Sequence, residues 1–268
     1  MHEEKILVID YGSQYTQLIA RRIRENNTYC EVLNPSSLNK KEIYSNVIGV
    51  ILSGGPSSVT NNDTYDLPDL LFKKNIPLLG VCFGMQLICK KFNGIIKEST
   101  SREYGKAVLE ITKDVKIFKG VNKSIEAWMS HGDSVIKAPE NFTIIASTNK
   151  KGLSAIKSNN KEIYGIQFHP EVTHTLDKGK IIFNFVNNIC KSNGSWTTKN
   201  IIENQVVEIK NKVKNDHVIL GLSGGVDSSV AAAIIHKAIK DQLTCIFIDN
   251  GLLRLNEKNQ VEEGFKDF

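Results

Sequence analysis

The segment Gly80–Gly84, with the sequence Gly-Val-Cys-Phe-Gly, is the stretch that most constrains how this chain can fold. The apolar run Ile76–Leu79 before it predicts a short buried strand, and Met85–Lys91 after it predicts the start of a helix. A cysteine between two glycines at such a junction indicates a sharp turn that holds the thiol beside a helix N-terminus, where thiolate is favoured. A small buried core cysteine is the alternative interpretation of Cys82, and this segment alone does not decide between them.

The first eighty residues alternate between strand-like and helix-like patterns. A helix is expected over Thr16–Glu25, and β-branched runs predict strands at Lys5–Asp10, near Tyr29–Leu33 and at Val47–Leu52. Such alternation is typical of an α/β fold with a mostly parallel sheet flanked by helices. From Tyr104 to Ile145 short strands, Lys106–Ile111 and Thr143–Ser147, indicate an antiparallel excursion from that sheet.

Composition narrows the class of protein. The chain has 268 residues, enough for more than one domain, and its net charge of +5 is spread without a dominant block of like charge. We therefore expect no nucleic-acid surface. No apolar stretch approaches the ~20 residues needed to span a bilayer, so we expect no membrane segment either. Five cysteines without CxxC spacing, and an N-terminus without a signal-peptide pattern, predict reduced thiols in a cytoplasmic protein.

Two polar segments in the first part of the chain remain ambiguous when taken singly. Ser53–Ser57 could form a phosphate cradle, although Pro56 removes one donor, or it could bring the bare backbone of Gly55 close to a reacting centre. Trp128–Asp133 reads as an ordinary turn when taken without context.

A histidine and a glutamate follow the predicted strand Ile163–Phe168. In an extended chain residues i and i+2 face the same side, so His169 and Glu171 are expected to project together. The carboxylate can then orient the imidazole toward Cys82, which predicts a nucleophile, a base and an orienting group.

A second domain is predicted after a polar linker, Lys191–Ser195, so that the domains are expected to span residues 1–194 and 195–268. After a helix over about Lys199–Lys214, the strand His217–Leu220 leads into the loop Gly221–Ser229 and a helical run, Val230–Lys240. Glycines, serine hydroxyls and a helix N-terminus indicate phosphate binding, and Asp227 could hold a divalent cation. The loop lacks the Gly-Lys-Ser/Thr ending of a Walker A motif.

One further strand, Leu243–Asp249, follows, and a single strand-helix-strand unit cannot cover a sheet. We therefore expect this chain to be the front part of a longer protein.

Longer runs carry a family resemblance. The first part resembles the class I (triad) glutamine amidotransferases, and the second resembles the N-type ATP pyrophosphatases, which have an adenine-nucleotide α-hydrolase-like α/β fold. Both parts in this order are similar to the family of glutamine-hydrolysing GMP synthetases. The runs that carry the resemblance are Tyr11–Leu18, Leu52–Pro56, Trp128–Asp133, Gln167–His174, Leu222–Ser229 and Asp249–Glu257.

The resemblance implies a role for each matching residue. Cys82 would be the nucleophile, His169 the general base and acid, and Glu171 its orienting group. Backbone N–H groups of Gly55 and Phe83 would form the oxyanion hole. The glutamine-binding residues would be Gln86, Ser130, His131, Gly132 and Asp133. The ATP-binding residues would be Ser223, Gly224, Gly225, Val226, Asp227, Ser228 and Ser229, with Asp227 also on Mg²⁺.

The reaction implied by the resemblance has two halves. Glutamine is hydrolysed at Cys82, and the ammonia aminates XMP to GMP after ATP has adenylated the XMP base, with no prosthetic group. The family is also dimeric through a C-terminal domain that this chain lacks. We therefore expect this chain to hydrolyse glutamine without making GMP by itself.

Three alternatives compete with this interpretation. The chain could be a glutaminase subunit for another acceptor, although the Ser223–Ser229 loop counts against that. The ATP loop could serve NAD synthesis, asparagine synthesis or tRNA modification, although a triad glutaminase ahead of it counts against those. A non-catalytic glutamine- or nucleotide-sensing module is the third, and an intact Cys82, His169 and Glu171 counts against it.

Overall fold

The computed structural model describes residues 4–60, 65–148 and 152–266. The chain divides into two compact units, Met1–Ser195 and Trp196–Phe268, called here the first and second units. Each is described by itself. In the residues described, no helix combines the length and apolar character that crossing a bilayer requires.

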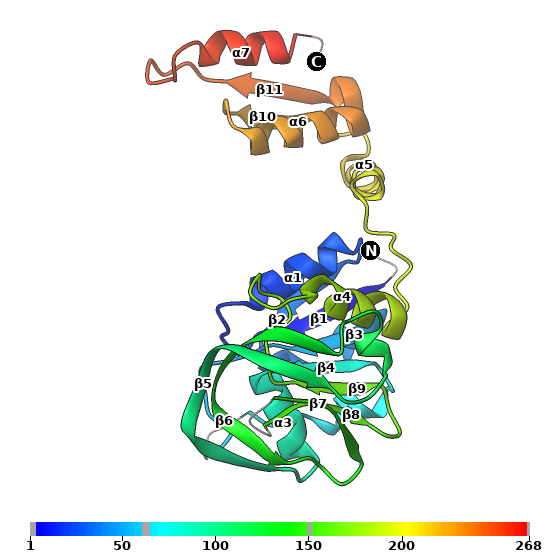
Figure 1. Cartoon of the computed structure of the whole chain (residues 1–268). Coiled ribbons are helices and arrows are strands. Elements are labelled where there is room, and N and C mark those ends of the chain that lie inside the picture. Colours follow the sequence, from blue (N-terminus) through cyan, green and yellow to red (C-terminus); the bar gives the residue numbers. More distant parts are fainter. Residues whose placement is uncertain (1–3, 61–64, 149–151, 267–268) are drawn as a thin grey trace. The chain divides into compact units, whose positions relative to one another are not determined.

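The first unit is built on one nine-stranded sheet with the order β2-β1-β3-β4-β9-β8-β7-β5-β6 (Figure 1). The strands β2, β1, β3, β4 and β9 are parallel, and β8, β7, β5 and β6 continue the sheet in antiparallel pairs. The strands are β1 (Lys5–Ile9), β2 (Cys30–Leu33), β3 (Val47–Leu52), β4 (Leu78–Val81), β5 (Ile95–Ile111), β6 (Ser124–Lys137), β7 (Phe142–Thr148), β8 (Leu153–Ser158) and β9 (Ile163–Ile166). The predicted α/β class with a parallel centre is confirmed, and the complete sheet is mixed.

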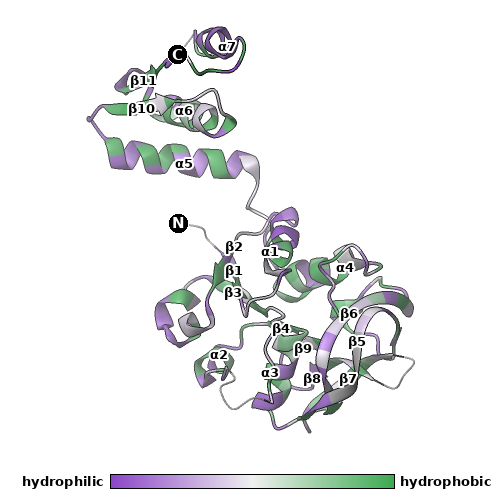
Figure 2. Cartoon of the chain, turned by 90° about the vertical axis from the view of Figure 1, so that its left-hand side faces the viewer, coloured by the Kyte–Doolittle hydropathy of each residue, from purple (hydrophilic) through white to green (hydrophobic). Residues whose placement is uncertain are grey.

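Two apolar layers, one on each face of the parallel strands, form the core of the first unit. Alternation along β1 sends Ile6 and Val8 to one layer and Leu7 and Ile9 to the other. Side chains of α1 and α4 fill the first layer, and those of α2 and α3 fill the second. Figure 2 shows these helices beside the sheet, coloured by hydropathy. The helical segments of this unit are α1 (Thr16–Glu25), η1 (Pro35–Asn39), η2 (Lys41–Tyr44), α2 (Asp69–Lys73), α3 (Phe83–Lys91), η3 (Lys116–Phe118), α4 (Lys178–Phe183) and the π-helical η4 (Asn184–Ile189).

The antiparallel part differs from the sequence prediction in its lengths. The predicted strand Lys106–Ile111 is the end of the 17-residue β5. The segment Trp128–Asp133, read from the sequence as a turn, lies inside β6, so that interpretation is wrong. Buried and more exposed side chains alternate regularly along β6. Two of the buried ones, His131 and Asp133, are polar, because that end of the strand lines a pocket. Polar residues at inward positions hid the period-two pattern.

The second unit contains a two-stranded parallel sheet of β10 (Val218–Leu222) and β11 (Leu243–Phe247). Its helical segments are α5 (Thr198–Val213), α6 (Val226–Ile239), η5 (Lys240–Gln242) and α7 (Glu257–Gly264). Helix α6 begins four residues before the predicted Val230, so Asp227, Ser228 and Ser229 belong to its first turns. An acidic residue is favourable in a first helical turn, where it faces the positive end of the helix dipole.

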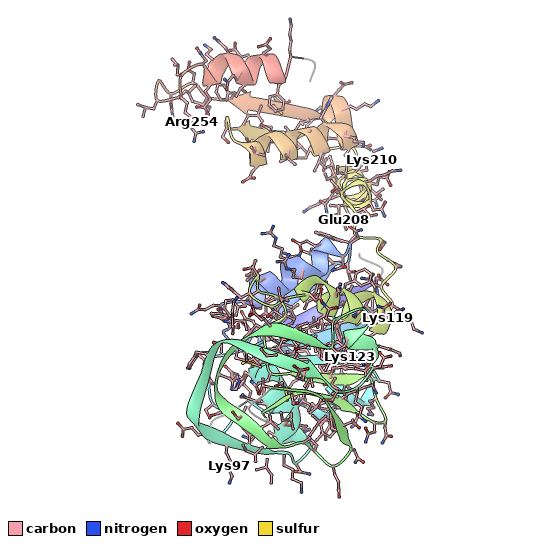
Figure 3. The ribbon with its side chains drawn as sticks, in the orientation of Figure 1. Lys97, Lys119, Lys123, Glu208, Lys210 and Arg254 are labelled. Carbon is pink, nitrogen blue, oxygen red and sulfur yellow. The ribbon has the colours of Figure 1, made fainter. Side chains whose placement is uncertain are left out.

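The charged side chains labelled in Figure 3 lie on the outside of the two units. Lys97, Lys119 and Lys123 of the first unit and Glu208, Lys210 and Arg254 of the second are exposed (Figure 3).

Candidate active site

Cys82 occupies the turn between β4 and α3 in a strained backbone conformation. Its φ of 52° and ψ of −105° lie in a region that residues with a side chain rarely adopt. Gly80 and Gly84 make this turn possible, because a Cβ on Gly80 would lie 2.5 Å from the backbone of Gly84, and one on Gly84 would lie 2.4 Å from the carbonyl oxygen of Leu52. The predicted sharp strand-to-helix turn is therefore present, with the thiol at its apex.

His169 and Glu171 lie in the turns that follow β9. His169 Nδ1 is 2.7 Å from Glu171 Oε1, and both side chains are buried. The strand ends at Ile166, so this contact is made across a turn and not along an extended strand as the sequence suggested. The expected pairing of His169 with Glu171 is therefore present, but a turn and not an extended strand brings the two side chains together.

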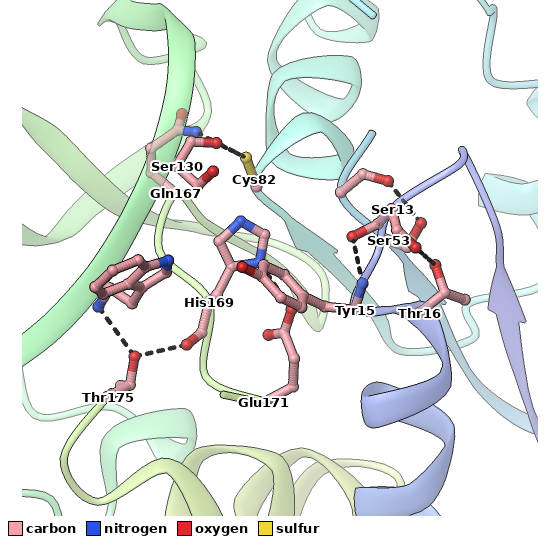
Figure 4. Close-up of polar contacts among 12 residues, drawn as sticks. Ser13, Tyr15, Thr16, Ser53, Cys82, Ser130, Gln167, His169, Glu171 and Thr175 are labelled. Atoms are coloured by element: carbon pink, nitrogen blue, oxygen red, sulfur yellow. Dashed lines mark hydrogen bonds and ion pairs between the residues drawn. The ribbon is translucent and has the colours of Figure 1, made fainter. Parts of the chain in front are cut away.

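The backbone of His169 is fixed by two neighbouring segments. Its N–H donates to the carbonyl oxygen of Trp128 on β6, and its own carbonyl oxygen accepts from the Thr175 hydroxyl at 2.6 Å. The same hydroxyl accepts from the Trp128 N–H at 3.0 Å. These bonds hold the imidazole between the thiol of Cys82 and the carboxylate of Glu171 (Figure 4).

The surroundings of His169 favour its charged form. Burial by itself lowers the pKa of this imidazole, but the Glu171 carboxylate and the Cys82 sulfur together outweigh burial and raise it to about 10. An imidazolium near neutral pH suits a thiolate beside it and a proton donor to a departing amine.

A pocket of about 370 Å³ opens beside Cys82. All the residues predicted to bind glutamine or to form the oxyanion hole line it, namely Gly55, Phe83, Gln86, Ser130, His131, Gly132 and Asp133. These residues span almost eighty positions in the sequence, and the fold brings them together around one pocket. A second hollow, lined by Tyr15 and His169 among others, shares Gly55, Cys82 and Ser130 with the first.

The two predicted oxyanion donors are backbone groups at the edge of this pocket. Phe83 is the first residue of α3, and the first N–H groups of a helix have no acceptor within it. Gly55 is a position where only a bare backbone fits, because a Cβ there would lie 2.7 Å from the carbonyl oxygen of Tyr11. Gly55 also lines the pocket with Cys82, which favours the second interpretation of the Ser53–Ser57 loop, in which the backbone itself faces the reacting centre.

Hydrogen bonds stiffen the pocket wall. Gln86 Nε2 donates to the carbonyl oxygen of Asp133 at 2.9 Å, and the Asp133 carboxylate accepts from the Ser58 hydroxyl at 2.5 Å. Ser58 is one of several lining residues that sequence reasoning missed, together with Glu98 and Tyr104 on β5 and Tyr15 before α1.

Gln167 is the most important of the missed residues. Its Nε2 lies 3.6 Å from Cys82 Sγ, and the Gln167 side chain is buried. Its position two residues before His169, at the end of β9, was the available signal, since both positions follow the strand toward the same site.

The predicted nucleotide loop lies wholly in the second unit. Ser228 Oγ donates to the carbonyl oxygen of Ser223 and accepts from its N–H, and Ser229 Oγ donates to the carbonyl oxygen of Gly225. The loop therefore closes on itself at the N-terminus of α6 and is exposed. The Glu257 carboxylate covers Gly224 closely, so that a Cβ on Gly224 would lie 1.9 Å from Glu257 Oε1.

Comparison with known proteins agrees with this geometry. Residues 7–189 match the family model described as glutamine amidotransferase class-I, and residues 198–262 match the model described as NAD synthase. The chain belongs to the class I glutamine amidotransferase family, and its second unit is the start of an ATP pyrophosphatase α/β region.

Among individual proteins, the chain is similar to those named GMP synthase [glutamine-hydrolyzing]. It is 48% identical over 266 residues to that of Aliivibrio fischeri, covering 99% of this chain and 51% of the relative. It is 49% identical over 269 residues to that of Francisella philomiragia, covering 100% of this chain and 52% of the relative. The chain thus spans about half the length of the curated relatives it matches.

Solved structures show the same fold. A protein from Thermoplasma acidophilum, described as a putative GMP synthase subunit, superposes with a TM-score of 0.61 at 29% identity, covering 71% of this chain and 95% of that one. A glutamine amidotransferase from Thermotoga maritima, at 20% identity and a TM-score of 0.54, covers 90% of this chain and 93% of that one and supports the fold alone.

Proposed function

We propose that the first unit hydrolyses glutamine to glutamate and ammonia, with Cys82 as nucleophile. The single observation that carries this proposal is the buried Cys82–His169–Glu171 arrangement at the edge of a polar pocket. A core cysteine needs neither a strained turn nor an imidazole of raised pKa and a buried carboxylate beside it. Together these three features supply a nucleophile and its proton donor.

The proposed reaction uses these residues in two steps. The Cys82 thiolate attacks the side-chain amide carbon of glutamine, and the resulting oxyanion lies against the N–H groups of Gly55 and Phe83. His169 gives its proton to the departing nitrogen, so ammonia leaves and a thioester forms. Water then attacks the thioester with His169 as base, which releases glutamate and restores the thiol. Glu171 holds the imidazole in place throughout.

The pocket wall suits the other end of the substrate. Asp133 and Glu98 present carboxylates that can accept from the α-ammonium group of glutamine. Ser130, His131 and Gly132 on β6 contribute the neighbouring polar surface, and Gln86 holds Asp133 in place through its backbone carbonyl.

For the whole protein, we propose ATP-dependent amination of XMP to GMP in the cytoplasm. The similarity to GMP synthases across both units supports this assignment over another acceptor and over a sensing module. Ser223 to Ser229 would hold the ATP phosphates at the N-terminus of α6, in keeping with the exposed hydroxyls and bare glycines there. Dimerisation of the whole protein, through a domain beyond these residues, is part of the same proposal.

Mg²⁺ would accompany ATP and neutralise phosphate charge. Asp227, exposed in the first turn of α6, is the residue that we assign to it. In the part of the chain that the structure describes, no three His, Cys, Asp or Glu side chains gather as a metal site. The donor set fits an ion that takes most of its ligands from phosphates and water, as Mg²⁺ does.

The test is glutamate release from glutamine by the purified chain. Cys82→Ala should lower the rate by at least about a thousandfold, because the nucleophile of a covalent mechanism is lost. Cys245→Ser, on β11 of the second unit, is the matched control and should keep the full rate. Glutamate release at the original rate by Cys82→Ala would refute the proposal.

If the basal turnover is too slow to measure, an electrophilic glutamine analogue replaces the substrate. Peptide mass spectrometry should then find the label on Cys82 and not on Cys30, Cys89, Cys190 or Cys245. Equal labelling of Cys82 and Cys245 would count against a glutamine-directed nucleophile.

A further inference from the structure

A buried row of amide side chains leads from the pocket wall to the nucleophile. Gln86 Nε2 donates to the carbonyl oxygen of Asp133 at 2.9 Å and lies 3.4 Å from Gln167 Oε1. Gln167 Nε2 lies 3.6 Å from Cys82 Sγ, a contact drawn in Figure 4. Gln86 and Gln167 are 3% and 2% exposed, so both amides are almost fully shielded from solvent.

The chemistry of the row determines which end of each amide faces which partner. A backbone carbonyl can only accept, so the atom of Gln86 that faces Asp133 must be its nitrogen. That nitrogen also faces Gln167, which must therefore present its oxygen to Gln86. The remaining end of Gln167, its NH₂ group, then points to the sulfur.

Two contacts on the sulfur act in opposite directions. The carbonyl oxygen of Ser130, 3.5 Å from Cys82 Sγ, can accept from a thiol but repels a thiolate. The N–H of Gln167 can donate to a thiolate and gains much less from a thiol. We propose that Gln167 is a positioning residue that favours the thiolate of Cys82 by donating an N–H to its sulfur, with Gln86 fixing the orientation of the donor. This inference rests on the proposed function, since it concerns the same nucleophile.

Other titratable groups around Cys82 also influence its charge. They come from β5, β6, the segment before α1 and the turns after β9, and they are Glu98, Tyr104, His131, Asp133, Tyr15, His169 and Glu171. Substitutions at Gln167 leave all of them in place, so a change in thiolate population reports on the amide.

The experiment measures iodoacetamide alkylation of Cys82 against pH by peptide mass spectrometry. A Cys245→Ser parent removes the partly exposed cysteine, and Cys30, Cys89 and Cys190 are buried. In this parent we compare Gln167→Leu, which removes the donor, with the near-isosteric Gln167→Glu, which replaces the donor with an acceptor.

Both variants should move the midpoint of alkylation to higher pH. Gln167→Leu should shift it by about one pH unit, so that Cys82 reacts about tenfold more slowly below both midpoints. Gln167→Glu should shift it further, because it adds a carboxylate beside the thiolate. The rates should converge at high pH, whereas a mere packing defect would change the rate at all pH values without moving the midpoint.

Unchanged midpoints in both variants would overturn the inference. If Gln167→Leu does not fold, as judged by circular dichroism, the unbranched and uncharged Gln167→Met, which removes the donor without adding a carboxylate, decides. Glutamate release by the parent and labelling of Cys82 by the electrophilic glutamine analogue are measured in parallel. A parent that neither releases glutamate nor takes up the analogue on Cys82, but shows the shift, contradicts the proposed function and leaves the inference standing. An active or labelled parent whose variants show no shift contradicts the inference and leaves the proposed function standing.

Discussion

The two units differ in how the fold holds the candidate site of each. In the first unit the site is buried between strands and turns far apart in sequence, and Cys82 and His169 are 4% and 3% exposed. In the second unit the loop Ser223–Ser229 lies at one strand-to-helix junction and is bonded largely to itself. One site therefore depends on the whole fold around it and the other on a single local turn.

The packing of the two units differs in the same sense. Both faces of the first unit's parallel strands are covered by apolar layers. In the second unit, the apolar side chains buried among its described residues are Ala232, Ala238, Ile239 and Val261, while Ile219, Leu252 and Leu255 are 71%, 89% and 91% exposed. We infer that a substitution in the first unit lowers the stability of the whole unit. A substitution in the second unit should disturb only the residues around it.

The largest effect is expected from Gly84→Ala. The new Cβ would meet the carbonyl oxygen of Leu52 at 2.4 Å, and backbone on both sides cannot yield. Overpacking of this kind should lower the free energy of unfolding of the first unit by about 3 kcal/mol or more. Chemical denaturation followed through the tryptophan on β6, Trp128, measures it.

Gly221→Ala is the matched control for this substitution. It lies in β10 of the second unit, at a position where a Cβ would meet nothing within 4 Å. Gly221→Ala should change the free energy of unfolding of the second unit by less than about 1 kcal/mol. If Gly84→Ala and Gly221→Ala lowered the free energy of unfolding of their units equally, the proposed difference between the two units would be wrong.

The next effect is expected from Glu171→Gln, which removes the charge behind His169. Glutamate release should fall about a hundredfold or more, because the imidazole loses the group that orients it and stabilises its charge. The pKa of His169, raised to about 10, should fall toward its ordinary value of 6.5. Nuclear magnetic resonance titration of the imidazole measures this, with a His169→Asn spectrum for assignment.

The same change has a consequence for stability against pH. The folded pKa of His169 lies above its unfolded value, so its contribution is full below about pH 6.5 and is lost as pH rises toward about 10. Unfolding of the first unit should therefore become easier across that window, and less so in Glu171→Gln. Glu126→Gln, which removes only an exposed ion pair with Lys106, is the control and should behave like the original chain. An unchanged slope in Glu171→Gln would contradict the assignment of His169 as an imidazolium.

The smallest effect is expected from Ser228→Ala in the second unit. The hydroxyl bonds the N–H and the carbonyl oxygen of Ser223, so its loss should destabilise the loop by about 1 kcal/mol. Hydrogen exchange should rise at Ser223 to Ser229 and stay unchanged in the first unit, and glutamate release should keep its rate. A loss of glutamate release would show that the loop is not the local structure described here.

The sequence predicted some parts of this site well and others poorly, for physical reasons. The Cys82 turn and the Ser223–Ser229 loop were predictable because glycine spacing and strand-to-helix patterns act over a few neighbouring residues. The placement of His131 and Asp133 on a strand was not, because polar side chains stood where the pattern required apolar ones. The contact between His169 and Glu171 was expected, but its turn geometry was not.

By itself, the sequence determined the α/β class, the order of the two parts and the residue types available for thiol chemistry, since these follow from periodicity and local motifs. Only the tertiary structure decided that Gln167 faces Cys82, that Gln86 orients it, and that Ser58 and Asp133 close the pocket wall. These contacts join strands and loops 75 to 85 residues apart. The direction of a hydrogen bond across such a distance depends on the packing of the complete sheet, and no local pattern encodes it.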